Sequence, residues 1–185
     1  LAAIITGAFI SSMVAGPISG LILRGHREKS ILDFLPARSV LARLKGKTRE
    51  DVFVELAGEA ADHSHLEESD LLVSIKKRES LMTTAVGRSV AFPHARLPGF
   101  GQALIIPALH PTGIDDWENP DGKSVRFVFL ILTNDKDDNV QLAILRHLSK
   151  TFSSQEVQDS LLNAPDATTF YQILRNSLKH AHVPR

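Results

Sequence analysis

The 185-residue sequence predicts an α/β protein, in which helices flank both faces of a β-sheet and one transmembrane helix precedes them. Two observations support this prediction. The residues from Leu1 to Leu23 include no Asp, Glu, Lys, Arg or His. In the rest of the chain, segments with helical character come before, between and after the segments with strand character, which is the order expected when helices pack against a sheet.

The uncharged N-terminal segment, residues 1–23, is long enough to cross a bilayer. As a helix it would extend about 34 Å, at about 1.5 Å per residue, against a hydrocarbon core of about 30 Å. A signal peptide has an initiating Met, a basic region and a short apolar core, none of which is present, and a buried core helix usually has about 10–14 residues. Gly7, Ser11 and Ala15 recur at four-residue spacing, which favours the end of a longer membrane domain over a single-pass anchor.

The segment that follows the apolar span, residues 24–30, is basic. Its basic residues are Arg24, His26, Arg27 and Lys29. Such residues directly after an apolar span mark the cytoplasmic side of a membrane. We therefore expect residues 24–30 to be a juxtamembrane linker, and residues 31–182 to be a cytoplasmic domain. The lipid bilayer is then the expected partner of the first 23 residues.

The composition excludes several classes of function. The chain has 21 Lys+Arg against 21 Asp+Glu, and no run of basic residues lies beside aromatic ones, so nucleic acid is not the expected partner. The absence of cysteine excludes disulfide scaffolds, thiolate zinc sites, iron–sulfur clusters and cysteine nucleophiles. His63 and His65 have a spacing that could hold a metal, but no carboxylate-rich third ligand accompanies them, so we predict no metal site there.

The domain begins with two predicted helices and a strand. Thr48 and Asp51 form an N-cap pair ahead of the first helix, and a second helix covers residues 67–77. Residues 84–92 are rich in β-branched and apolar side chains but include Gly87, which predicts a strand with a turn or bulge.

Two more strands are predicted in the middle of the domain. Residues 102–109 form the first, and Pro107 places it at a sheet edge or a bulge, with His110 in the loop after it. Residues 125–132 are a nearly unbroken apolar run, which indicates a strand buried on both faces.

The last part of the chain is predicted to be helical. One helix runs from about residue 138 to 152, and Ser154 and Asp166 are N-cap candidates for two more. Residues 180–182, His-Ala-His, are expected to be a frayed tail.

His94 is the residue that most invites a chemical interpretation. The predicted strand leads to Pro93, which ends the ladder and presents the imidazole at a strand end, where sites of α/β sheets tend to lie. Arg78 lies sixteen residues earlier and Arg96 two residues later. A neutral imidazole is a competent nucleophile, and a guanidinium stabilises a phosphoryl group in transit. On these grounds alone, a structural histidine remains the commoner case.

The segment around His94 resembles the active-site signature of the fructose/mannitol-type enzyme IIA domains of the bacterial sugar phosphotransferase system. The signature positions are held by Glu79, Val86, Gly87, Val90, Ala91, Phe92, Pro93, His94 and Ala95. Phe92 departs from the pattern, because an aliphatic residue is usual there. The stretch from Arg78 to Leu81, together with Thr84, also resembles the family.

The resemblance implies a mixed β-sheet flanked by helices on both faces and a histidine that accepts a phosphoryl group from the histidine phosphocarrier protein. It implies that His94 is phosphorylated and that Arg78 is the partner of the phosphoryl group. The residues expected to support the phosphate site are Glu79, Thr84, Arg96 and Gln141. No metal or organic cofactor is expected.

One departure from the family concerns a second histidine, which members usually have early in the helix after the buried strand. Alignment on Leu148-Ser149 puts Gln141, or its neighbour Val140, at that position. Glutamine can hydrogen-bond a phosphate oxygen but adds no charge. His147 is no obvious substitute, because six residues of helix is about 240° of rotation. Onward transfer of the phosphoryl group is therefore less expected than its acceptance at His94.

Residues 7–20 also resemble the end of the last helix of a cation/proton antiporter, and some antiporters carry a cytoplasmic IIA-like domain there. The favoured hypothesis is a IIA-like domain that is phosphorylatable at His94 and regulates an attached transporter membrane domain. A genuine phosphohistidine carrier of a sugar-uptake system and a degenerate domain that only binds partners are the alternatives. Whether the domain acts as an enzyme depends on which of these holds.

Overall fold

The computed structural model describes residues 29–179 and 182–183. The predicted transmembrane helix, residues 1–23, and most of the predicted linker lie outside the described residues. Among the residues that are described, no helix has both the length and the apolar character needed to span a bilayer.

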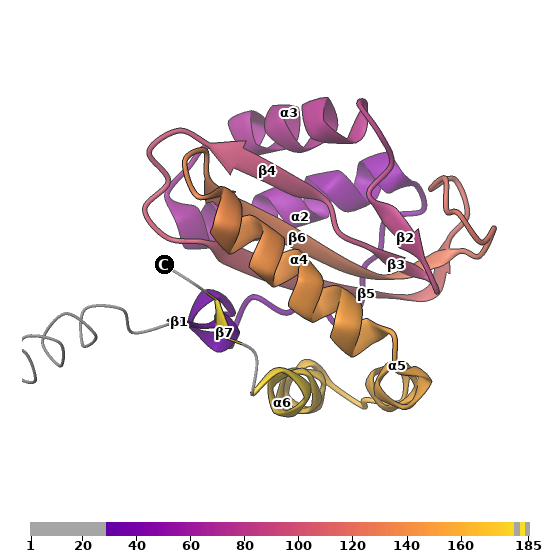
Figure 1. The fold of residues 1–185 in the computed structure, drawn as a ribbon. Coiled ribbons are helices and arrows are strands. Elements are labelled where there is room, and N and C mark those ends of the chain that lie inside the picture. The colour runs from indigo at the N-terminus through magenta and orange to yellow at the C-terminus, as the bar shows by residue number, and fades with distance from the viewer. Residues whose placement is uncertain (1–28, 180–181, 184–185) are drawn as a thin grey trace, which may run out of the picture.

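In the described part of the chain, β2 to β6 follow one another directly, with two α-helices before them and three after them (Figure 1), and two short strands lie at the ends. The elements are β1 (Lys29–Ser30), the 3-10 helix η1 (Ile31–Phe34), α2 (Arg49–Ser64), α3 (Glu68–Glu79), β2 (Ala85–Gly87), β3 (Val90–Ala91), β4 (His94–Leu97), β5 (Leu104–Ile114), β6 (Val125–Asn134), α4 (Asp138–Phe152), α5 (Gln155–Leu162), α6 (Ala167–Leu178) and β7 (His182–Val183).

Strand β6 is the centre of the main sheet. β5 pairs with one edge of β6 in antiparallel fashion, whereas β3 and β4 pair with the other edge in parallel, which makes the sheet mixed. Every residue of β6 from Phe127 to Leu132 is buried, with alternate side chains in the two core clusters of the domain. The prediction of a strand buried on both faces is therefore confirmed.

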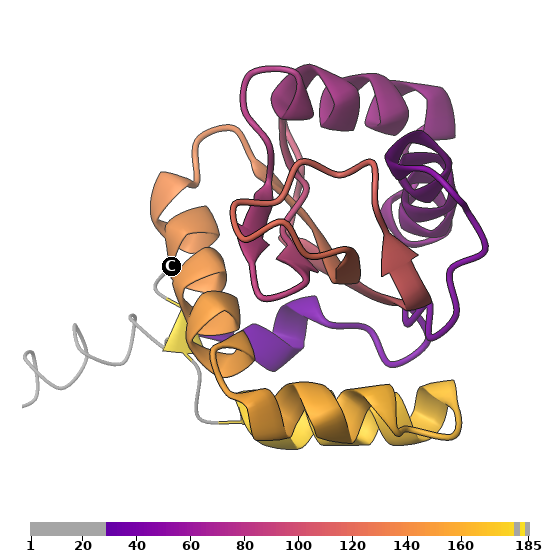
Figure 2. The ribbon, with the colours of Figure 1, turned by 90° about the vertical axis from the view of Figure 1, so that its right-hand side faces the viewer.

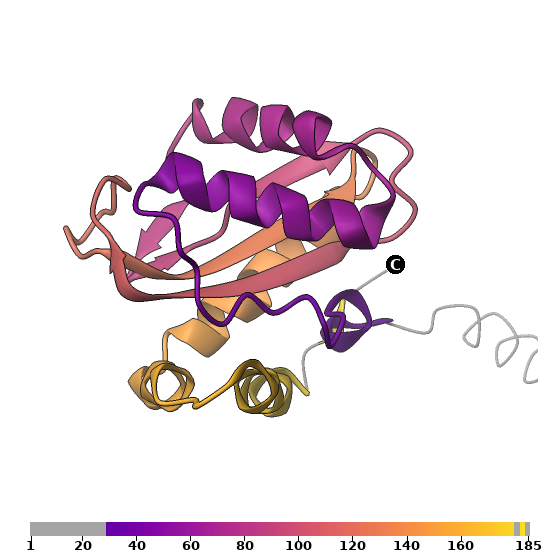
Figure 3. The same ribbon diagram turned by 180° about the vertical axis from the view of Figure 1, so that it is seen from behind.

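Helices cover both faces of this sheet. α2 and α3 pack on one face, and Figure 3 shows α2 lying across it. α4 packs on the other face, with α5, α6 and η1 beyond it (Figures 1 and 2). The predicted class, a mixed sheet between helices, is confirmed for the described part of the chain.

Several predicted helix ends are also confirmed. Thr48 and Asp51 form a reciprocal capping box at the start of α2. Ser154 accepts a hydrogen bond from the backbone N–H of Val157 at the start of α5, and Asp166 does the same for Thr169 in α6. These side chains satisfy backbone donors that a helix start would otherwise leave unpaired.

The strand with a turn or bulge that was predicted over residues 84–92 is a hairpin, and its turn lies at Gly87, as expected. β2 and β3 pair in antiparallel fashion, and the turn places Gly87, Arg88 and Ser89 at positive φ angles of 86°, 55° and 62°. The Asp121 carboxylate accepts a hydrogen bond from the Arg88 backbone N–H at 2.7 Å. This contact from a distant loop stabilises a backbone conformation that non-glycine residues rarely adopt.

The structural positions that were predicted for two histidines are wrong. His110 is not in a loop but within β5, where it is buried and its Nδ1 accepts a hydrogen bond from the Gly113 backbone N–H at 2.8 Å. His182 belongs to β7, which pairs with β1 at Ser30. In both cases the decisive interactions are with backbone groups that local sequence does not reveal. The pairing of β1 with β7 also joins residues 29 and 30 to the domain.

Candidate functional site

His94 is the first residue of β4, and its backbone continues the line of β3 along β6. Ala91 pairs with Val128 and His94 pairs with Ile131, so the register along β6 is unbroken. The carbonyl of Pro93 accepts a hydrogen bond from the Ile131 N–H at 2.9 Å. The expectation that Pro93 ends the ladder is therefore wrong, because the proline lacks only a donor and its carbonyl still pairs.

The imidazole of His94 has a defined tautomer. Arg78 Nε lies 2.9 Å from His94 Nε2, and His94 Nδ1 lies 2.8 Å from the carbonyl oxygen of Phe92. An arginine Nε can only donate, and a carbonyl oxygen can only accept. The proton therefore resides on Nδ1, and Nε2 carries the lone pair.

The environment also keeps this imidazole neutral. Burial lowers the pKa of His94 below its ordinary value of 6.5, and the positive charges of Arg78 and Arg96 lower the pKa further. The hydrogen bond to Phe92 and the charge of Glu79 act in the opposite direction without reversing the result. A neutral imidazole with a directed lone pair is the form that can attack phosphorus.

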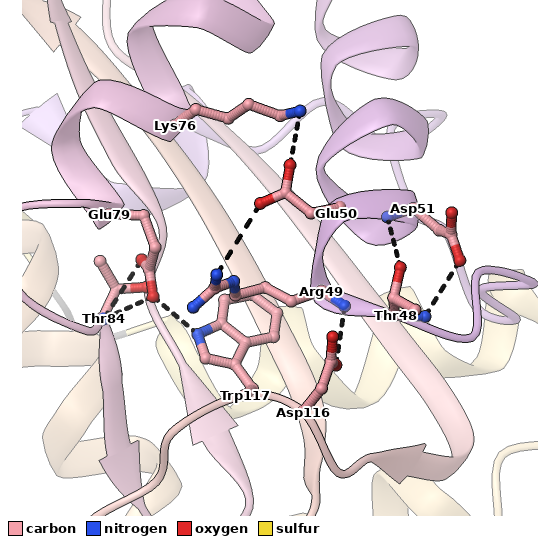
Figure 4. Close-up of polar contacts among 9 residues, drawn as sticks. All are labelled: Thr48, Arg49, Glu50, Asp51, Lys76, Glu79, Thr84, Asp116 and Trp117. Carbon is pink, nitrogen blue, oxygen red and sulfur yellow. Dashed lines mark hydrogen bonds and ion pairs between the residues drawn. The ribbon is translucent and has the colours of Figure 1, made fainter.

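Arg78 comes from the last turn of α3, where its guanidinium also donates to the carbonyl of Met82 at 3.1 Å. The helix itself is tied to α2 by an ion pair between Lys76 and Glu50 (Figure 4). The guanidinium is thus held between the end of a fixed helix and the following loop.

Glu79 and Thr84, which were predicted to support the phosphate site, bond to each other and not to His94. The Glu79 carboxylate is buried and accepts hydrogen bonds from the Thr84 backbone N–H, at 3.1 and 3.2 Å, and from Trp117 Nε1, at 2.9 Å (Figure 4). Their role in this geometry is to hold the chain between Arg78 and β2. Trp117 was missed at the sequence level, since its distance along the chain gives no sign of this contact.

Arg96 is on β4 and is held by residues of α4. Its Nε donates to Gln141 Oε1 at 2.9 Å, and its terminal nitrogen pairs with the carboxylate of Asp138 in the first turn of α4. The same Gln141 oxygen accepts a hydrogen bond from the Thr133 hydroxyl at 3.3 Å. Asp138 and Thr133 are site residues that the sequence did not single out.

These groups surround a cavity of about 670 Å³. It is lined by Ser74, Lys77, Arg78, Leu81, His94, Ala95, Arg96, Pro98 and Gln141. Four of the six residues predicted for the site thus share one cavity, and its lining has cationic side chains but no Asp or Glu. Lys77 and Ser74 were missed, although Lys77 directly precedes Arg78.

The part of the chain that the structure describes contains no group of three or more His, Asp or Glu side chains able to hold a metal ion. The cavity has instead the charge and the donors that suit an anion. The guanidinium groups of Arg78 and Arg96 and the neutral imidazole of His94 all line it.

Known proteins share this architecture. A nitrogen regulatory protein of Bradyrhizobium diazoefficiens is 31% identical over 144 residues, which is 78% of this chain and 94% of that protein. The crystal structure of the nitrogen regulatory protein IIA-Ntr from Neisseria meningitidis superposes with a TM-score of 0.72 at 26% identity, covering 77% of this chain and 97% of the other. The mannitol IIA of Escherichia coli, at 18% identity, shares the fold with a TM-score of 0.64, covering 75% of this chain and 97% of the other.

A family model covers nearly the whole described domain. It is that of the phosphoenolpyruvate-dependent sugar phosphotransferase system, EIIA 2, and it matches residues 33–177. The match includes the hairpin, the histidine and both arginines of the cavity. The chain therefore belongs to the EIIA 2 family of the phosphotransferase system.

Proposed function

We propose that His94 accepts a phosphoryl group at Nε2 from a phosphohistidine donor such as the histidine phosphocarrier protein. The observation that carries this proposal is the pair of hydrogen bonds on the imidazole, which places the proton on Nδ1 and the lone pair on Nε2, facing Arg78. The lowered pKa of His94 supports it, since the imidazole stays neutral at physiological pH.

The transfer is a displacement at phosphorus. The phosphorus–nitrogen bond of the donor breaks, and its electron pair stays on the donor imidazole. The lone pair of His94 Nε2 forms the new bond, while the Nδ1 proton stays on the ring, bonded to the Phe92 carbonyl. Arg78 gives up its hydrogen bond to Nε2 and donates to the phosphoryl oxygens, where charge-assisted bonds are strong.

We propose that the output of this domain is regulatory. Two curated relatives, from Bradyrhizobium diazoefficiens and Pseudomonas aeruginosa, are named nitrogen regulatory proteins, the second at 29% identity over 140 residues. Gln141, at the place where a second histidine is usual, supports the same conclusion. The second candidate is a carrier for sugar uptake, which the similarity to the fructose-specific EIIABC component of Bacillus subtilis favours, at 26% identity over 150 residues.

We further propose that the regulated protein is a cation/proton antiporter to which residues 1–23 belong, with the domain on the cytoplasmic side of the inner membrane. The support is the uncharged segment and the basic residues after it. A phosphoryl group adds about two negative charges, enough to rearrange an interface. It changes transport only if the transporter states contact the domain differently. Unchanged transport and control in His94→Ala would overturn this part.

The first test is phosphorylation of the whole 185-residue chain, kept in mild detergent because of its apolar first residues. The chain is incubated with phosphoenolpyruvate, enzyme I and the histidine phosphocarrier protein, and acid-labile phosphate is followed by intact mass. We expect one phosphoryl group on the wild type and on His65→Asn, an exposed histidine as control, and none on His94→Ala.

Two results would overturn the proposal. One is a folded wild type that takes no label while a control IIA domain is labelled in the same mixture. The other is a label that persists in His94→Ala.

A further inference from the structure

The structure assigns to Gln141 the role of a positioning residue: it orients Arg96 so that this guanidinium binds the phosphoryl group carried by His94. This inference rests on the proposed function and concerns the position where a second histidine is usual in the family. This departure then has a functional consequence. Gln141 carries no charge, but it holds the charged side chain of Arg96, which comes from β4.

The orientation of the Gln141 amide is determined by its neighbours. Arg96 Nε, which can only donate, lies 2.9 Å from one end of the amide, so that end is the oxygen. The hydroxyl of Thr133 on β6 donates to the same oxygen at 3.3 Å. Only 8% of Gln141 is exposed, so the side chain is fixed by packing as well as by these two bonds.

Arg96 is on the same side of β4 as His94. The two residues are two positions apart on the strand, and side chains with that spacing lie on one face. Both line the cavity, and Arg96 is close enough for its charge to act on the imidazole. A phosphoryl group on Nε2 would therefore lie beside the Arg96 guanidinium.

The contacts that hold Arg96 leave most of its donors available. A guanidinium has five N–H groups, of which Gln141 engages the one on Nε and Asp138 engages one on a terminal nitrogen. The bond to Gln141 sets the plane of the group, and the remaining N–H groups can serve phosphate oxygens. A leucine at position 141 would leave the guanidinium held by Asp138 alone and free to turn toward solvent.

The cavity then offers two permanently charged guanidinium groups, from Arg78 and Arg96, in the same lining as the imidazole. A histidine at position 141 would add a charge only while protonated, whereas arginine stays charged at all relevant pH values. With glutamine at position 141, the permanent charge of Arg96 takes the place of the titratable charge of a histidine.

The test uses inorganic phosphate as a probe and needs no phosphodonor. The whole chain, carbon-13 labelled at histidine, is titrated with sodium phosphate at constant ionic strength, and the His94 ring resonance reports binding. We expect Arg96→Ala to weaken phosphate binding about tenfold, close to the lower limit for a hydrogen bond to a charged group. Gln141→Leu should weaken it less, about fivefold, because the charge of Arg96 remains in the cavity. Gln158→Leu, a buried glutamine outside the cavity, is the matched control and leaves binding unchanged.

The double variant separates positioning from packing. If Gln141 acts through Arg96, adding Gln141→Leu to Arg96→Ala causes no further loss, because the partner is already gone. Arg96 has a side chain that is 43% exposed, so Arg96→Ala is expected to fold and to keep the test decisive even if Gln141→Leu does not.

Three results overturn the inference: no phosphate binding by the wild type, unchanged binding in Arg96→Ala, or losses that add in the double variant. Failure of the proposed function gives a different pattern. The wild type would then bind phosphate with the expected dependence on Arg96 and Gln141 and yet take no label from the phosphocarrier protein.

Discussion

The two arginines that share a cavity with the His94 imidazole are held in different ways. On the α3 side, Arg78 donates directly to the nitrogen that carries the lone pair, at 2.9 Å. On the α4 side, Arg96 contacts only other protein groups, Gln141 and Asp138. One cation is therefore bonded to the reacting atom before phosphate arrives, while the other is held ready beside it.

This difference indicates a division of labour. In the resting state, Arg78 donates to the lone pair of Nε2. When phosphorus reaches Nε2, Arg78 must give up this hydrogen bond and donate to a phosphoryl oxygen instead. Arg96 needs no such exchange. Groups already oriented toward developing charge require little reorganisation during the reaction. The following predictions test this comparison, from the largest expected effect to the smallest.

Arg78→Ala should cause the largest loss. Removal of a donor from the reacting centre commonly lowers a rate by about 10²–10³-fold, and the rate of phosphoryl transfer from the phosphocarrier protein measures it. Arg78→Lys should recover part of the rate, because lysine keeps the charge but not the planar fork. Arg175→Ala on α6 removes a positive charge outside the cavity and serves as control. A larger loss in Arg96→Ala than in Arg78→Ala would reverse the comparison.

Glu79→Ala should lower the free energy of unfolding by about 3 kcal/mol, since it leaves the buried N–H groups of Thr84 and Trp117 without their acceptor. Urea denaturation measures this. Glu118→Ala, an exposed neighbour of Trp117, should stay within about 0.5 kcal/mol of the wild type. A Glu79 variant of normal stability that fails to accept phosphate would instead place this carboxylate in the chemistry of the cavity.

His94 should make stability depend on pH. Burial and the two arginines lower its pKa in the folded state, so below pH 6.5 the unfolded chain binds more protons than the folded one. This contribution is present in full above pH 6.5 and is lost as the pH falls through the folded-state value. In urea denaturation at pH 7.5 and 5.5, His94→Gln should lose less stability on acidification than the wild type. Equal losses would mean that the imidazole is not held neutral.

Thr133→Val should have the smallest effect. It removes a bond of 3.3 Å to Gln141 while Arg96 keeps its own contact, so phosphate binding should weaken about twofold, the value of a weak neutral hydrogen bond. The phosphate titration measures this change. A loss of phosphate binding as large as that of Gln141→Leu would show that the position of Arg96 depends on Thr133 of β6 as much as on the Gln141 amide.

Local sequence was sufficient for several features because their causes are local. The helix starts at Thr48, Ser154 and Asp166 depend on side chains bonding backbone groups three residues away. The apolar run of β6 needs no partner to be recognised. His94 and Arg78 were found through an ordered motif, in which the residue types and their spacing are the signal.

Contacts between distant segments of the chain could not be predicted from the sequence. Glu79 meets Trp117 38 residues away, and Arg96 meets Gln141 45 residues away. The continuity of β3 and β4 past Pro93 depends on β6, whose Ile131 N–H bonds the proline carbonyl. The same holds for His182, which the pairing of β7 with β1 places in a strand.

The sequence by itself determined where α2, α5 and α6 begin, that β6 is buried, which histidine follows Pro93 and that an arginine precedes it, since these follow from patterns within short stretches. Only the tertiary structure decided which nitrogen of His94 carries the lone pair, that Glu79 supports the site from behind, and that Gln141 holds Arg96. The physical reason is that a tautomer or a guanidinium orientation is set by hydrogen-bond partners, and here β6, α3 and α4 bring those partners together from remote parts of the chain.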